Sequence, residues 1–341
     1  MSRMRLPRAT PWITNRLMPT GGVMKPISSQ TIITIPNQTG SKPSPVTSGN
    51  RSGPRGCYST EVRVGLSVDP PLAAIPALLR EENVDVYQTV LRDPGRFGNY
   101  GVPDPADRAA LVEGLRGRAV WGLAHGSLLI NLASPEGRIR NSSVSSLLAD
   151  LKVAAEVGLD AVCFHVGYAK GHPSADAALT LATRKLGELI ERMPAGPRLL
   201  LENSCEGSEL GQTIDELARL VRDVGAPADR FALLLDTCHL HAAGFDLAGA
   251  DAGERLAGAL SDAGVLERVA AFHLNDSKMP CGAHRDLHAV PGAGTIGMGV
   301  VAVASHPAFA TLPGVLEISV EDARGGLAFL RQHGAAAPPS S

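Results

Sequence analysis

Short apolar runs rich in branched side chains alternate with longer mixed segments from residue 62 to the end of the chain. The middles of these runs, such as LLLE, ALLLD and AVCFH, are continuously apolar, which is typical of strands covered on both faces. The pattern predicts eight strands, at residues 63–68, 84–90, 119–125, 161–166, 198–203, 231–237, 269–276 and 314–319.

Between the strands, apolar residues recur at spacings of three and four, the periodicity of an amphipathic helix. The clearest helical segments are residues 142–157, 175–193, 213–224 and 322–333, whereas residues 298–311 are short and irregular. Eight strand–helix alternations in one domain predict an α/β fold of the (β/α)8, or TIM-barrel, type, which needs about 250 residues. An open doubly wound sheet is the alternative, but no glycine-rich dinucleotide fingerprint follows the first strand.

The first 60 residues differ in composition from the rest. They contain eight Lys or Arg and no Asp or Glu, are rich in Ser, Thr, Pro and Gly, and show no sustained apolar period. We expect a disordered extension at 1–60, a single barrel domain at 61–334 and a flexible tail at 335–341. An organelle transit peptide has a similar composition but needs a long amphipathic face, so a dispensable tail or an over-long start assignment is favoured.

Charge and cysteine content narrow the function classes. Beyond residue 60 the chain has 24 basic and 34 acidic residues, so DNA contact would require a local basic patch or bound cations. No run of about 18 apolar residues is present, so no membrane span is predicted. The five cysteines form no CxxC pair, and Cys163 and Cys238 are expected to be buried, which fits a reducing cytoplasm.

Side chains of metal-ligand type stand at, or shortly after, the ends of the third to eighth predicted strands. The set is His125, His165, Glu202, Asp236, His239, His273, Asp286, His288 and Glu317. Because the carboxyl ends of barrel strands converge on one mouth, the nine side chains are expected to share one cavity. So many titratable groups need compensating positive charge, which divalent cations supply. Ordinary hydrogen-bonding roles are assigned to the other histidines, His172, His241, His284, His306 and His333.

The ligand types indicate the metal. Five imidazoles and four carboxylates, without a thiolate, suit zinc, with manganese or iron as replacements. At three or four ligands per ion, and with a shared carboxylate, nine residues can hold three ions. A cluster of that kind suits phosphodiester hydrolysis, because metal ions activate water and neutralise phosphoryl and leaving oxygens.

At these residues the sequence resembles the endonuclease IV family of apurinic/apyrimidinic endonucleases. The matching segments are AHGSLLINLASP (124–135), FHVG (164–167), LLLENSCEGSELG (199–211), LLLDTCHLHAAGFDL (233–247), FHLNDSKMPCGAHRDLHAVPGAGTIG (272–297) and SHPAF...LPGVLEIS (305–319). The resemblance implies a TIM-barrel enzyme of base excision repair. Such an enzyme cuts duplex DNA on the 5′ side of an abasic sugar and leaves a 3′-hydroxyl and a 5′-deoxyribose phosphate.

The resemblance also implies a role for each ligand. Three zinc ions would be held: one by His125 and His165, a second by Asp236, His273 and Glu317 with Glu202 bridging the two, and a third by His239, Asp286 and His288. Glu202 would be the catalytic residue, orienting a hydroxide that bridges the first two ions. The third zinc would stabilise the leaving 3′-oxygen.

DNA contacts are implied less directly. The segment QTVLRDPGRF (88–97) resembles an arginine-bearing loop of the family, so Arg92 or Arg96 would reach phosphate or the gap left by the missing base; the alternative is a solvated surface arginine. Asn203, Asn275 and Lys278 are candidates for supporting the ligands or for contacting phosphate.

Several positions depart from the family pattern. The first strand reads GLSVDPP and keeps only Ser67 of a usual His-Ser pair. Leu128 replaces a tyrosine that enters the DNA helix, although an apolar wedge can also unstack bases. Ala169 and Ile318 replace a usual His and Thr. The ligand set is therefore more complete than the DNA-reading surface.

Two other functions remain open from the sequence. A metal-dependent sugar isomerase or epimerase of the same barrel superfamily uses fewer ligands, and His239, Asp286 and His288 would then be surplus. A non-enzymatic binder of damaged DNA would need no complete ligand set. For the nuclease we expect a monomer without an obligate protein partner, because a long polymer must reach an open face.

Overall fold

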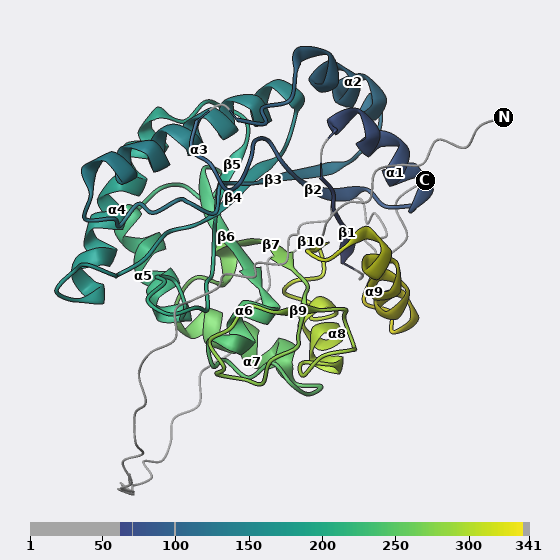
Figure 1. Cartoon of the computed structure of the whole chain (residues 1–341). Coiled ribbons are helices and arrows are strands. Elements are labelled where there is room, and N and C mark those ends of the chain that lie inside the picture. The colour runs from purple at the N-terminus through teal and green to yellow at the C-terminus, as the bar shows by residue number, and fades with distance from the viewer. Residues whose placement is uncertain (1–61, 70, 99, 337–341) are drawn as a thin grey trace, which may run out of the picture. The chain divides into compact units, whose positions relative to one another are not determined.

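The computed structural model describes residues 62–69, 71–98 and 100–336. Eight parallel strands close into a barrel in the order β1-β10-β7-β6-β5-β4-β3-β2, with β2 paired to β1 (Figure 1). The barrel strands are β1 Arg63–Ser67, β2 Val86–Val90, β3 Trp121–His125, β4 Ala161–His165, β5 Arg198–Glu202, β6 Phe231–Asp236, β7 Val269–His273 and β10 Pro313–Leu316. The predicted closed barrel is confirmed, and the open sheet is wrong.

Helices surround the strands, as Figure 1 shows. Their bounds are η1 Leu72–Ala74, α1 Ile75–Glu81, α2 Pro105–Leu115, α3 Gly137–Val157, α4 Ala175–Arg192, α5 Ile214–Val224, α6 Thr237–Ala242, α7 Ala252–Asp262, η2 Leu266–Arg268, α8 Met298–Ala304 and α9 Val320–Gln332. Helices α4 and α5 begin where Ser174 and Thr213 accept hydrogen bonds from backbone N–H groups three residues on. Helices α3 and α5 end at left-handed glycines, Gly158 and Gly225.

Two predicted elements differ from the structure. The strand expected at 269–276 ends at His273, and Asp276–Ser277 instead form β8, which pairs antiparallel with β9, His288–Ala289. The irregular segment 298–311 contains the short helix α8. The extension expected at 1–60 lies outside the described residues, as does most of the tail. Within the described part of the chain, no helix is long and apolar enough to cross a membrane.

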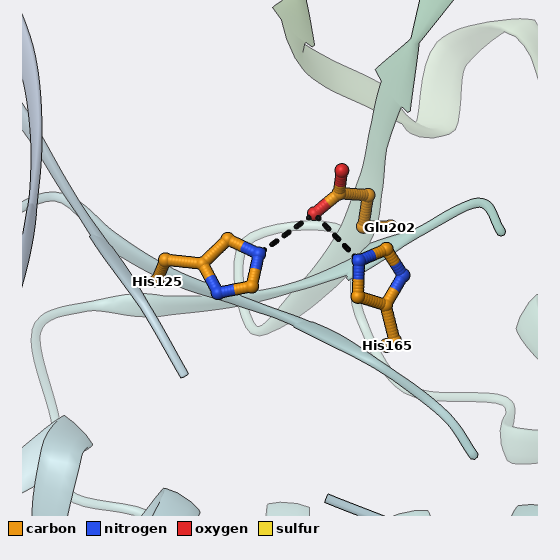
Figure 2. Close-up of side chains that lie close together, drawn as sticks. All are labelled: His125, His165 and Glu202. Atoms are coloured by element: carbon orange, nitrogen blue, oxygen red, sulfur yellow. Dashed lines mark hydrogen bonds and ion pairs between the residues drawn. The ribbon is translucent and has the colours of Figure 1, made fainter. Parts of the chain in front are cut away.

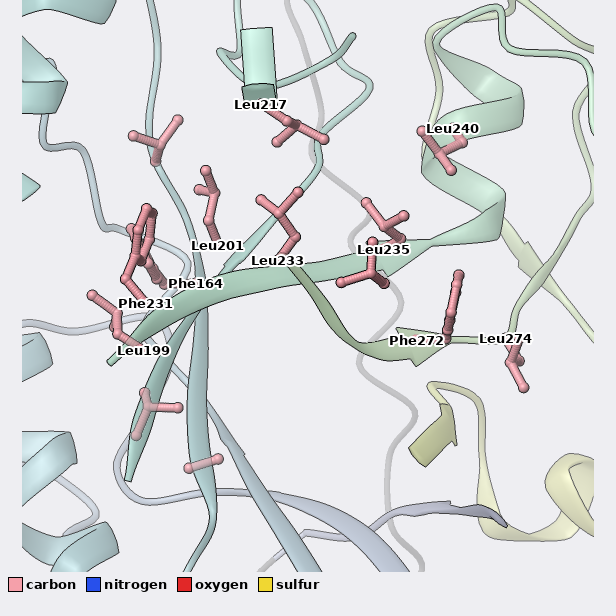
Figure 3. Close-up of a cluster of buried hydrophobic side chains, with 14 of the residues drawn as sticks. Phe164, Leu199, Leu201, Leu217, Phe231, Leu233, Leu235, Leu240, Phe272 and Leu274 are labelled. Atoms are coloured by element: carbon pink, nitrogen blue, oxygen red, sulfur yellow. The ribbon is translucent and has the colours of Figure 1, made fainter. Parts of the chain in front are cut away.

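The core has two layers that follow the alternation of each strand. Leu199 and Leu201 point outward against the helices, as Figure 3 shows, while Leu200 lies in the barrel interior with Leu234 and Val315. The same alternation turns the last residues of the central strands inward, because they share the parity of these interior side chains. Strand parity therefore delivers the ligand-type side chains to the barrel mouth, which we define as the carboxyl ends of the strands.

Candidate metal centre

One oxygen of Glu202 lies between two histidines from neighbouring strands. Its Oε2 is 3.2 Å from His125 Nε2 and 3.6 Å from His165 Nε2, and both rings point at it in Figure 2. The side chain of Glu202 is fully buried. These three residues offer ligand atoms close enough to share one ion.

The second oxygen of Glu202 belongs to another group. His273 Nδ1 lies 2.9 Å from Glu202 Oε1, 3.0 Å from Glu317 Oε2 and 3.7 Å from Asp236 Oδ2. Three carboxylates thus converge on one imidazole nitrogen. Glu202 joins this group to the first, as a bridging carboxylate would.

A third group, formed by His239, Asp286 and His288, lies next to Asp236. Asp286 lies 3.4 Å from His239 Nε2 and 3.0 Å from His288 Nε2, and His288 Nε2 is also 3.5 Å from Asp236 Oδ2. Ring centroids step from His125 to His165, His239 and His288 at 5.7, 5.5 and 5.4 Å. All nine ligand-type side chains therefore lie in one continuous cluster.

Burial and neighbouring charges have opposite effects on the pKa values in the cluster. Burial alone would lower the pKa of His273, but Glu317 and Glu202 raise it well above the usual value. Burial likewise opposes the charge of His288, whose pKa Asp286 raises well above its usual value. Burial would raise the pKa of Glu202, yet His273 helps to hold it well below its usual range. The buried carboxylates favour the charged form of the imidazoles, and a divalent cation can take the place of those protons.

The donor set fits a cation on two further observations. His288 Nε2 is buried and lies 3.0 Å from Asp286 Oδ1 without the geometry of a hydrogen bond, while Nδ1 of the same ring donates to the Glu317 carbonyl at 3.1 Å. Cys163 and Cys238 also lie near the cluster, and burial raises the pKa of both thiols. The nine ligand-type side chains themselves offer only nitrogen and oxygen atoms.

Two asparagines hold two of the ligand-type side chains, Asp236 and Glu317, in place. Asn203 Oδ1 accepts from the Asp236 N–H at 2.7 Å, and Asn203 Nδ2 donates to the Asp236 carbonyl at 3.2 Å. Asn275 Nδ2 donates to Asp236 Oδ2 at 2.6 Å, while its Oδ1 accepts from the Glu317 N–H at 2.9 Å. Both amides are fully buried, and their hydrogen bonds go to Asp236 and Glu317, which fits a supporting role better than a contact with phosphate.

The prediction that Arg92 faces DNA is wrong, and so is the alternative of a solvated arginine. Arg92 is 5% exposed, its Nε donates to the buried carboxylate of Asp150 on α3, and its Nη1 donates to the Gly98 carbonyl. This contact lies 58 positions away in sequence, which the local pattern could not reveal. Arg92 therefore stabilises the loop that carries it.

The rim, by which we mean the loops at residues 91–98, 100–104 and 126–136, carries exposed side chains of mixed chemistry. Arg96 is largely exposed and lies over the ring of Tyr100 at 5.4 Å. Tyr100 and Leu128 are 57% and 37% exposed. Two hydrogen bonds join the loop at 91–98 to the loop at 126–136. Pro94 O accepts from the Leu128 N–H at 3.0 Å and from Ser127 Oγ at 2.8 Å. Lys278, which lies outside these loops and directly follows β8, is exposed as well.

Sequence reasoning missed Gln88 and Tyr100. Gln88 is a buried amide at an inward position of β2, and it contacts both His273 and Glu317. A polar residue between the apolar Val86 and Val90 was the available signal. The five histidines outside the ligand set lie in the hydrogen-bonding roles expected of them, contacting Ala133 O, Leu247 N, Cys205 O, Glu254 Oε2 and Phe329 O.

Known proteins share this architecture over most of the chain. Residues 76–333 match the xylose isomerase-like TIM barrel family. A protein of Aquifex aeolicus named "Probable endonuclease 4" is 32% identical over 246 residues, 71% of this chain and 86% of that protein. A protein of the same name from Nitratidesulfovibrio vulgaris is 34% identical over 238 residues, which are 67% of this chain and 84% of that protein. The chain belongs to the endonuclease IV family.

Solved structures agree with this membership. Endonuclease IV from Thermus thermophilus superposes with a TM-score of 0.68 at 28% identity, covering 80% of this chain and 98% of that one. A D-tagatose 3-epimerase-like protein superposes at 0.62 with 20% identity, over 80% and 97% of the chains, which shows a shared fold alone. The resemblance to the endonuclease IV family is confirmed, and it places the chain among hydrolases.

Proposed function

We propose that this protein is a zinc-dependent endonuclease of base excision repair that hydrolyses the DNA backbone on the 5′ side of abasic sites, leaving a 3′-hydroxyl and a 5′-deoxyribose phosphate. The observation that carries the proposal is the continuous cluster of nine ligand-type side chains, in which Glu202 and Asp236 each face two groups. Membership of the endonuclease IV family supports it. A sugar epimerase would leave the group of His239, Asp286 and His288 without a use.

Three zinc ions would be held by the three groups in turn, as the resemblance implies. Ions bound there would activate a water molecule and neutralise the scissile phosphate and the leaving 3′-oxygen. Manganese or iron can replace zinc at nitrogen and oxygen ligands of this kind.

Glu202 is the residue we assign to catalysis. Its two oxygens face different histidines, so its charge is shared between neighbouring groups at the centre of the cluster. Complete burial keeps bulk water away from this carboxylate and strengthens its electrostatic interactions. A water molecule placed beside it for attack on phosphorus would be oriented by an acceptor that cannot rotate freely.

The rim and Lys278 would contact the DNA. Arg96 and Lys278 offer cations for phosphate, and Leu128 and Tyr100 offer apolar and aromatic surface against which unstacked bases can pack. Beyond residue 60 the chain is net acidic, so this local supply of positive charge and the bound cations would carry the electrostatic attraction. We expect the protein to act as a monomer.

The test is incision of a labelled duplex that contains one tetrahydrofuran analogue of an abasic site. We expect a single cut on the 5′ side of the analogue, lost after treatment with a strong chelator and restored by zinc. The same duplex without the analogue is the control and should stay intact. The proposal is wrong if metal-loaded protein leaves the damaged duplex uncut and instead interconverts keto and aldo sugars.

A further inference from the structure

One histidine of the cluster is turned the other way round from the rest. In the other four rings Nε2 faces the carboxylates, and Nδ1 makes a hydrogen bond elsewhere in the protein. The Nδ1 partners are Gly126 O for His125, Ser204 Oγ for His165, Asn203 O for His239 and Glu317 O for His288. In His273, Nδ1 faces three carboxylates, and Nε2 lies 2.7 Å from Gln88 Oε1. A different partner must therefore fix this ring.

The amide of Gln88 has only one orientation that satisfies its neighbours. Its Nε2 donates to Glu317 Oε1, and a carboxylate can only accept. The Gln88 carbonyl oxygen is therefore the atom that faces His273 Nε2, and the thiol of Cys163 lies 3.8 Å from the same oxygen. Because a carbonyl oxygen can only accept, His273 must carry a proton on Nε2.

Gln88 reaches these partners across the barrel interior. It stands on β2, whereas His273 is on β7 and Glu317 follows β10, and neither strand is next to β2 in the barrel order. Its side chain is 2% exposed, so the amide is shielded from bulk water. One amide thus contacts two side chains of the same predicted ligand group.

We propose that Gln88 is a positioning residue that keeps His273 protonated on Nε2, so that the lone pair of Nδ1 is presented to a cation shared with Glu202, Asp236 and Glu317. This inference rests on the proposed metal centre. The hydrogen bond to Glu317 fixes a second ligand of that ion at the same time. Outer partners of metal ligands act in this way by setting the tautomer and the ring orientation.

Two substitutions separate the contacts of Gln88. Gln88→Met keeps the approximate volume and removes both hydrogen bonds, whereas Gln88→Glu keeps an acceptor for His273 and loses the donor to Glu317. The matched control is Thr89→Val on the same strand, because the buried Thr89 hydroxyl has no hydrogen-bond partner. Folding of each variant is checked by circular dichroism and thermal melting.

The measurements are zinc affinity, by competition with a chromogenic chelator, and the imidazole signals of zinc-loaded, ¹⁵N-histidine-labelled protein. In the unsubstituted protein and Thr89→Val we expect a protonated Nε2 at His273, assigned by its loss in His273→Asn. In Gln88→Met we expect zinc affinity at one site to fall roughly 10- to 100-fold. Gln88→Glu should keep the His273 Nε2 proton signal.

The proposed role of Gln88 is wrong if Gln88→Met folds, binds zinc as tightly as Thr89→Val and keeps the same His273 Nε2 signal. If Gln88→Met does not fold, loss of the His273 Nε2 proton in Gln88→Glu would overturn it. Absence of tightly bound zinc in the unsubstituted protein would instead reject the proposed metal centre.

Discussion

At the barrel mouth Glu202 is fully buried and faces four imidazoles, whereas on the rim Tyr100 and Leu128 expose 57% and 37% of their surface. Strand parity fixes the positions of the side chains at the mouth, and every ligand-type side chain there makes a further hydrogen bond or ion pair. The rim is formed by loops, and its exposed side chains can be substituted without disturbing the barrel strands. The ligand set can therefore match the family while Leu128 replaces the usual aromatic residue.

The largest expected effect lies at the centre of the mouth. Glu202→Gln keeps the shape of the side chain but removes the charge that faces both the His125 and the His273 groups. We expect incision to fall on the order of 1,000-fold or more, as for a catalytic residue that acts within a unit. Single-turnover incision rates of matched, zinc-loaded samples measure it. A loss of less than tenfold would contradict the catalytic assignment.

Among these predictions, the free energy of unfolding should depend most on the buried ion pair between Arg92 and Asp150, which lies beneath the rim. Asp150→Asn removes the charge partner of the buried Arg92, and we expect a loss of roughly 3 kcal/mol in the free energy of unfolding. The control is Glu156→Gln, which breaks an exposed pair with Arg108 and should cost about 0–1 kcal/mol. Urea unfolding measures both, and equal losses would show that Arg92 needs no partner.

Support of the ligands comes next in size. Asn275→Ala removes the hydrogen bonds to Asp236 Oδ2 and from the Glu317 N–H, and zinc affinity should fall roughly 10- to 100-fold. Ser146→Ala is the control, because its buried hydroxyl makes no hydrogen bond. Affinity is measured by chelator competition. An unchanged value for Asn275→Ala would mean that backbone geometry alone places these two carboxylates.

The smallest effects are expected on the rim. Tyr100→Ala and Leu128→Ala should each weaken binding of an abasic duplex by about 1–3 kcal/mol and leave the zinc content unchanged. Val112→Ala, which trims an apolar side chain 42% exposed on α2, should have no effect. Fluorescence anisotropy with labelled duplex measures the affinity. Equal binding by all three variants would remove the rim from DNA recognition.

The sequence predicted the mouth better than its surroundings for a physical reason. His125, His165 and Glu202 end buried strands, and periodic alternation and chain direction suffice to bring such residues together. Arg92 was misplaced because its partner Asp150 comes from a distant helix. Gln88 was missed because an uncharged amide in a strand carries no ligand signal, and its role depends on partners across the barrel.

The metal content of the folded protein tests the central claim most directly. The cluster brings five imidazoles and four carboxylates to one mouth, and we hold that cations bind them. Protein loaded with zinc, dialysed extensively and shown to be folded should retain three zinc ions per chain by elemental analysis. A folded sample that retains no metal would contradict the account.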